Sequence, residues 1–128
     1  MVDEVDDASI PDDHAIWRRV PPDQAVIEDG RVVPSSGAFC DSSDGSGMSC
    51  SLGLPGRDPN DLLTGEAPGS GVVSITAGHL RSLGLKLVRR PEIGDPHHVE
   101  ILGKKPRGAR RRIKEVARWV VIAKANVT

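Results

Sequence analysis

The sequence predicts a small single domain of the α+β class, with a short-stranded mixed or antiparallel sheet, two or three short helices and a basic C-terminal helix. Three observations support this class. An Asp29-Gly30 pair separates two β-branched runs, as in a hairpin closed by a type I′ turn. The 14 Gly and 10 Pro residues divide the 128-residue chain into short segments, several of them β-prone. Near the C-terminus, apolar residues from Ala109 to Val120 recur at helical spacing.

The first 12 residues are acidic and poor in large apolar side chains, a composition typical of disordered chain. We therefore expect residues 1–12 to be a disordered N-terminal lead and residues 13–128 to form the single α+β domain. The first strand is predicted over 14–20, because the two prolines that follow it cannot continue a ladder. The Asp-Gly hairpin over 25–33 comes next.

The middle of the chain is predicted to hold four further strands, at 48–52, 71–76, 85–89 and 97–102. Asp58 followed by Pro59 suits the start of one helical turn. Thr76 is placed to cap a short helix that Gly84 ends. The last helix is rich in Lys and Arg, and the β-prone run at 119–123 leaves open whether this helix continues or a final strand follows it.

The net charge of −1 conceals a strong charge asymmetry along the chain. Residues 1–13 hold six acids and no base, whereas residues 104–118 hold eight bases and one acid. We call this second stretch the basic segment; its cationic residues are Lys104, Lys105, Arg107, Arg110, Arg111, Arg112, Lys114 and Arg118. Such a segment is typical of an anion-binding surface or of a solvated helix face. The acidic lead is a candidate to bind this segment in competition with an external anion.

The leading hypothesis is a small binding or accessory domain that engages an anionic partner, either nucleic acid or an acidic protein, through the basic segment. Two Trp, one Phe and no Tyr exclude the aromatic stacking platforms of single-strand binders. The chain has neither a secretory signal pattern nor an apolar run of roughly 20 residues. We therefore expect a cytoplasmic protein with no membrane partner, in which a Cys40–Cys50 disulfide is disfavoured.

A second hypothesis is enzymatic. Arg18 on a first strand, Ser35-Ser36 after the hairpin and Glu100 on a late strand resemble, in order and type, the arginine, serine-x-serine and glutamate plan of ADP-ribosyltransferase-like domains. Ser35-Ser36-Gly37 departs from the serine-threonine-serine of that family. The resemblance implies NAD as the cofactor: Arg18 would hold a phosphate, a Ser would support the nicotinamide ribose, and Glu100 would stabilise oxocarbenium charge.

Outside that hypothesis, the sequence predicts no cofactor and no metal site. Cys40 and Cys50 are too far apart for a zinc pair, and the adjacent His97 and His98 point to opposite faces of a strand. If the strand's apolar residues face the core, His98 and Glu100 share the other face as an exposed pair, with His98 a candidate general base. A third hypothesis is a purely structural protein-interaction domain.

Overall fold

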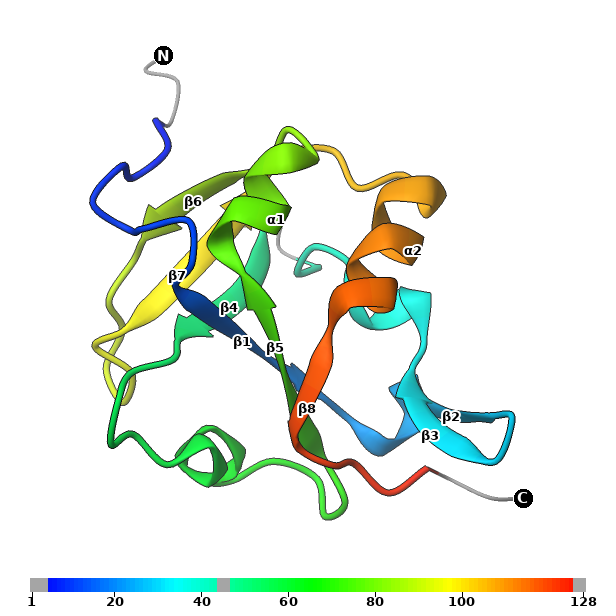
Figure 1. Cartoon of the computed structure of the whole chain (residues 1–128). Helices are drawn as coiled ribbons and strands as arrows, with labels where there is room; N and C mark the ends of the chain where they lie inside the picture. Colours follow the sequence, from blue (N-terminus) through cyan, green and yellow to red (C-terminus); the bar gives the residue numbers. More distant parts are fainter. Residues whose placement is uncertain (1–4, 44–46, 126–128) are drawn as a thin grey trace.

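The central element of the fold is a six-stranded sheet in which all neighbouring strands are antiparallel (Figure 1). The computed structural model describes residues 5–43 and 47–125. The strand order is β6-β7-β4-β1-β5-β8. The strands are β1 (Ala15–Val20), β4 (Met48–Leu52), β5 (Gly71–Thr76), β6 (Lys86–Arg89), β7 (His98–Leu102) and β8 (Arg118–Val121). The predicted class, a small α+β domain with an antiparallel sheet and few helices, is thereby confirmed.

A separate two-stranded hairpin lies beside the main sheet, formed by β2 (Ala25–Glu28) and β3 (Arg31–Pro34). Its turn residues have positive φ, 52° at Asp29 and 77° at Gly30, which is what a type I′ turn requires. The Asp-Gly signal therefore predicts this hairpin correctly. The indole of Trp119 in β8 donates a hydrogen bond of 2.8 Å to the carbonyl of Val32, and this bond ties the hairpin to the sheet.

The described helices are short. They are α1 (Ala77–Ser82), α2 (Arg107–Val116) and the 3-10 turns η1 (Pro22–Gln24), η2 (Ser36–Ala38) and η3 (Pro59–Leu63). Of these, α1 and η3 start at the signals that the sequence predicts. The Thr76 hydroxyl accepts a hydrogen bond from the His79 N–H at the start of α1. The Asp58 carboxylate accepts one from the Asn60 N–H at the start of η3. Because β8 follows α2, the β-prone run near the C-terminus is mainly strand.

One face of the sheet forms the hydrophobic core. Ile16 of β1, Val99 and Ile101 of β7, Leu80 of α1 and Ile113 of α2 belong to one buried cluster. These aliphatic residues and Phe39 replace the large aromatics that the composition lacks. Both helices therefore contribute to the core on this face.

The opposite face of the sheet is polar along its centre. Side chains that alternate with the core residues point to this face, and the register places Ser51 opposite both Trp17 and His98. Glu100 lies opposite Ser49 in the same ladder. This second face therefore carries the hydroxyl, imidazole and carboxylate groups that offer chemistry.

The acidic lead packs on the domain in its described part, where we expected disordered chain. Ile10 is fully buried in the core, which explains why this segment is held down. Asp6 and Asp12 pair with Arg81, and Asp7 pairs with Arg89. These acids therefore bind the α1 and β6 side of the sheet rather than the basic segment. The predicted disorder of residues 1–4 falls outside the described residues.

No helix within the described ranges is both long enough and apolar enough to cross a membrane.

Candidate functional site

Arg18 fixes backbone groups on the core face of the sheet. Its guanidinium donates to the carbonyls of Ala38 at 3.1 Å, Ser49 at 2.6 Å and Cys40 at 3.4 Å. All three acceptors are main-chain oxygens of η2, the following loop and β4. Arg18 therefore holds the segment after the hairpin against the sheet. Each of its three guanidinium nitrogens donates to a backbone carbonyl.

The structure does not bring the four transferase-like residues together. Arg18 lies opposite Val73, a core residue, whereas Glu100 alternates with Val99 and Ile101 and so faces the other side of the sheet. Ser35 donates its hydroxyl hydrogen bond to the Gln24 side chain, and Ser36 begins η2. The ADP-ribosyltransferase plan needs its arginine and its glutamate in one cleft. Their placement on opposite faces gives that hypothesis no geometric support.

The basic segment separates into cations that are engaged in the fold and cations that are exposed. The Lys105 side chain is 3% exposed, and its ammonium group donates to Asp41 and to the carbonyls of Ile101 and Gly103. Lys114 pairs with Glu28 of the hairpin. Arg110 is half-buried. The exposed members are Lys104, Arg107, Arg111, Arg112 and Arg118.

A groove of about 580 Å³ lies where α2, β8 and the hairpin meet. Arg111 of α2 and Arg118 of β8 line it, and Arg31 of β3 joins them from the hairpin. The same groove contains Lys114 and the carboxylates of Glu28 and Glu115, so cations outnumber acids by four to two. Sequence reasoning missed Arg31, because only the folding of the hairpin against α2 brings it to the basic segment.

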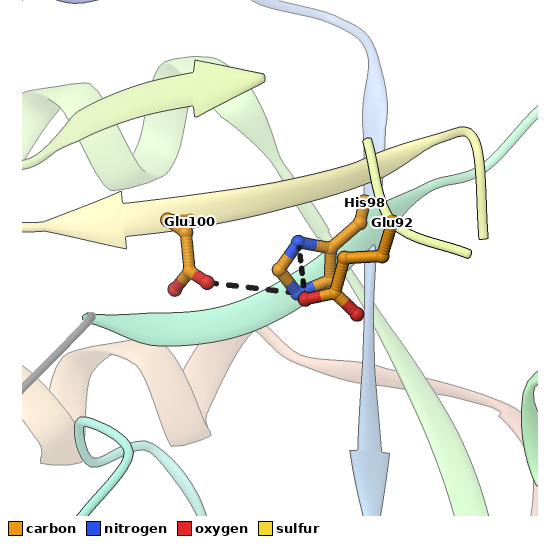
Figure 2. Close-up of side chains that lie close together, drawn as sticks. All are labelled: Glu92, His98 and Glu100. Carbon is orange, nitrogen blue, oxygen red and sulfur yellow. Dashed lines mark ion pairs between the residues drawn. The ribbon is translucent and has the colours of Figure 1, made fainter. Parts of the chain in front are cut away.

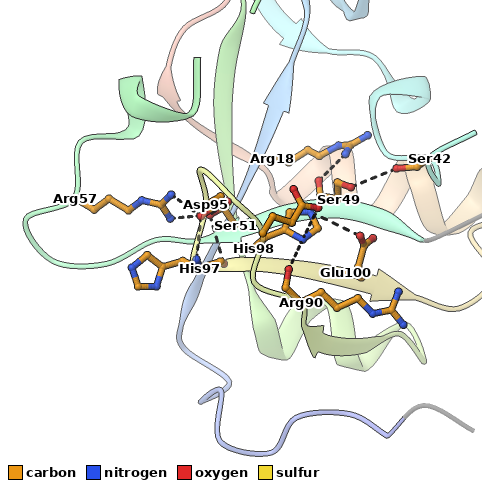
Figure 3. Close-up of polar contacts among 11 residues, drawn as sticks. Arg18, Ser42, Ser49, Ser51, Arg57, Arg90, Asp95, His97, His98 and Glu100 are labelled. Carbon is orange, nitrogen blue, oxygen red and sulfur yellow. Dashed lines mark hydrogen bonds and ion pairs between the residues drawn. The ribbon is translucent and has the colours of Figure 1, made fainter. Parts of the chain in front are cut away.

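On the second face of the sheet, a polar network joins β4 to two loops (Figure 3). The Ser51 hydroxyl donates to Asp95 at 2.7 Å and accepts from Arg57 at 2.7 Å. Arg57 also pairs with Asp95 at 3.0 Å and lies 5.7 Å from the centroid of the Trp17 ring. Burial raises the pKa of Asp95, but the hydrogen bonds from Ser51 and the His97 N–H and the charge of Arg57 outweigh it and lower this pKa overall.

This network forms part of the wall of a pocket of about 340 Å³. The floor comes from β1 and β4, and the walls come from the η3 region and the loop 92–95. Cys50 also lines the pocket, but burial raises the pKa of its thiol to about 11. A thiol with that pKa is protonated at neutral pH and is a poor nucleophile and metal ligand. Both described cysteines are free thiols.

At one end of the pocket, His98 lies between two carboxylates (Figure 2). Its Nδ1 is 3.3 Å from Glu92 Oε1 and its Nε2 is 3.7 Å from Glu100 Oε1. His98 and Glu100 share a face of β7, as strand alternation predicts. The expectation that this pair is exposed is wrong, because both side chains are buried. Figure 3 shows the ring of the neighbouring His97 turned away from this group.

Backbone hydrogen bonds fix the positions of these groups. Glu92 and Asp95 exchange N–H···O bonds of 2.9 and 3.1 Å, which close the loop into a tight bridge. The N–H of Arg90 donates to the carbonyl of His98 at 2.9 Å. No local sequence signal points to Glu92, because its approach to His98 depends on the fold of this loop over β7.

Comparison with known proteins yields no relative: no family model, no curated protein and no solved structure matches this chain.

Proposed function

We propose that this protein binds the phosphate backbone of nucleic acid through the groove between α2 and the hairpin. The observation that carries the proposal is the convergence of Arg31, Arg111 and Arg118, from three different elements, on one groove. No ion pair or hydrogen bond within the described chain engages these three side chains. They are therefore available to an external anion.

The chemistry of these side chains suits phosphate. A guanidinium group presents a rigid fork of N–H donors that matches phosphate oxygens, and it is more weakly hydrated than an ammonium group. Binding several phosphates with cations also releases condensed counterions, which makes the association favourable at low salt.

An acidic protein is the less favoured partner. The cores of protein–protein interfaces are depleted in charged residues. In this groove, by contrast, six of the eleven lining residues are charged, and three of these are arginines from three elements. A repeating backbone of phosphates fits such a lining better than a folded acidic surface does.

Fluorescence anisotropy with labelled single-stranded and duplex oligonucleotides tests the proposal. The groove variant R31S/R111S/R118S should lose about tenfold or more in affinity, since each phosphate contact contributes to binding. The matched control is K104S/R107S/R112S, which removes the same charge from exposed positions outside the groove lining. It should bind more tightly than the groove variant.

Three results would count against the proposal. Absence of oligonucleotide binding by the wild-type protein at low salt would overturn it. Equal losses in the two triple variants would indicate diffuse charge attraction without a groove. Tighter binding of polyglutamate than of any oligonucleotide would identify an acidic protein as the partner instead.

A further inference from the structure

We propose that Glu92, His98 and Glu100 form a binding site for a divalent first-row transition metal ion, with Zn²⁺ as the best-fitting member of that class. One ring nitrogen of His98 and one oxygen of each carboxylate lie within 4.8 Å of one another. The site lies on the second face of the sheet, away from the arginine groove. The inference is therefore independent of the proposed nucleic-acid binding.

The tautomer of His98 supports this assignment. Nδ1 lies 3.0 Å from the carbonyl oxygen of Arg90, which is an acceptor, so Nδ1 carries the proton and donates it. In the neutral ring, the form in which histidine binds metal ions, this leaves the lone pair on Nε2. Histidines that bind metals commonly donate their second N–H to a backbone carbonyl in this way, and the bond fixes the orientation of the ring.

The Nε2 atom of His98 lies near a carboxylate. Nε2 is 3.7 Å from Glu100 Oε1, which is beyond hydrogen-bond distance. In a tetrahedral zinc site, with bonds of roughly 2.0–2.2 Å, neighbouring ligand atoms are about 3.4 Å apart. A cation bound between the two atoms therefore fits their spacing.

Glu92 supplies the third ligand: its Oε1 lies 3.3 Å from Nδ1, and one of its oxygens lies within 4.8 Å of the other two ligand atoms. Its side chain is 56% exposed, but the backbone bridge with Asp95 holds the residue beside the ring. A nitrogen with two carboxylate oxygens suits Zn²⁺ and its first-row neighbours better than Ca²⁺ or Mg²⁺, which prefer oxygen ligands alone.

The site would have an open coordination position. Three protein ligands with the fourth position left to water or substrate is the composition of catalytic rather than structural zinc sites. Glu92 and His98 both line the 340 Å³ pocket, so that position would be reached from the pocket. The Ser51, Arg57 and Asp95 side chains are part of the same pocket lining.

Isothermal titration calorimetry of the full chain with Zn²⁺ alone tests this site. The wild-type protein should bind one ion per chain, and Co²⁺ in its place should give the visible absorption of a low-symmetry, low-coordinate site. Loss of a residue that hydrogen-bonds a metal ligand typically lowers metal affinity by about 10–100-fold. Loss of a ligand itself, in Glu100→Gln or His98→Gln, should therefore lower the affinity for Zn²⁺ by about tenfold or more.

The matched control is His97→Gln, which removes the neighbouring imidazole and should leave Zn²⁺ affinity unchanged. Because His98 and Glu100 are buried and their variants can fail to fold, Glu92→Gln at the exposed ligand provides a second, milder test with the same expected loss. The proposal is overturned if the wild-type chain binds no Zn²⁺. It is also overturned if folded Glu92→Gln binds Zn²⁺ as tightly as the wild-type protein, or if His97→Gln weakens binding as much as the ligand variants do.

Discussion

His98 Nε2 lies 3.7 Å from Glu100 Oε1, although the two side chains are only 6% and 5% exposed. A buried carboxylate next to an imidazole is stabilised by a positive charge, either a proton on the ring or a bound cation. Metal binding at Nε2 would supply this charge and leave Nδ1 in its contact with the Arg90 carbonyl, at 3.0 Å. This pair therefore connects the fold of β7 to the proposed metal chemistry of the pocket.

Ile10 tests whether the acidic lead is part of the folded domain. It is fully buried, so Ile10→Ala should lower the free energy of unfolding by about 2–5 kcal/mol. Val5→Ala, at a residue that is 78% exposed, is the matched control and should change it little. Urea denaturation followed by circular dichroism measures both. Equal stability of the two variants would show that the lead does not pack as described.

Arg18 should behave as a structural residue. Arg18→Met removes the donors to three carbonyl groups and should destabilise the fold by about 1–3 kcal/mol. Arg19→Met next to it removes only a half-exposed pair with Glu66 and should cost about 0–1 kcal/mol. Thermal unfolding compares the two. A stable Arg18→Met protein would point to a functional role for this arginine instead.

Asp95 should make stability depend on pH at the acidic end. Its pKa is lowered from 3.8 in the folded state, so the stabilisation is fully present above that value and is lost as the pH falls through the lower folded-state pKa. Asp95→Asn should therefore unfold more easily at pH 7 and lose less stability between pH 4 and 2. Urea midpoints across this range measure the difference. Parallel profiles of wild type and variant would contradict the network.

The two cysteines should differ in reactivity. Burial raises the pKa of Cys50 to about 11, whereas Cys40 is exposed. At pH 8 only about one Cys50 in a thousand is a thiolate, so iodoacetamide should label Cys40 first and Cys50 only after unfolding. Peptide mass spectrometry after brief labelling measures the order. Rapid labelling of Cys50 in the native protein would mean that the core is more open.

Local patterns predict much of this fold because their causes act within a few residues. The Asp29-Gly30 turn, the Thr76 cap and the Asp58 cap each depend on neighbouring backbone groups, and each occurs where the sequence predicts it. The burial of Ile10 is not predicted, because the acidic composition of the segment outweighs its one large apolar residue near the domain. Ile10 packs against core residues that are distant in the sequence.

The sites depend on contacts between distant segments, which one sequence does not encode locally. Alternation along β7 correctly places His98 and Glu100 on one face, but their burial depends on packing against the rest of the fold. Glu92 and Arg31 come close to the candidate sites only through tertiary packing. Arg18 was misplaced for the same reason, since its role depends on which sheet face forms the core.

The salt dependence of oligonucleotide binding tests the central functional proposal most directly. If Arg31, Arg111 and Arg118 each neutralise one phosphate, they should contribute about −2 to the slope of log K against log salt for a single strand. The groove variant R31S/R111S/R118S should lose that part of the slope, while K104S/R107S/R112S should retain it. An unchanged slope in the groove variant would contradict the proposal that this groove binds nucleic acid.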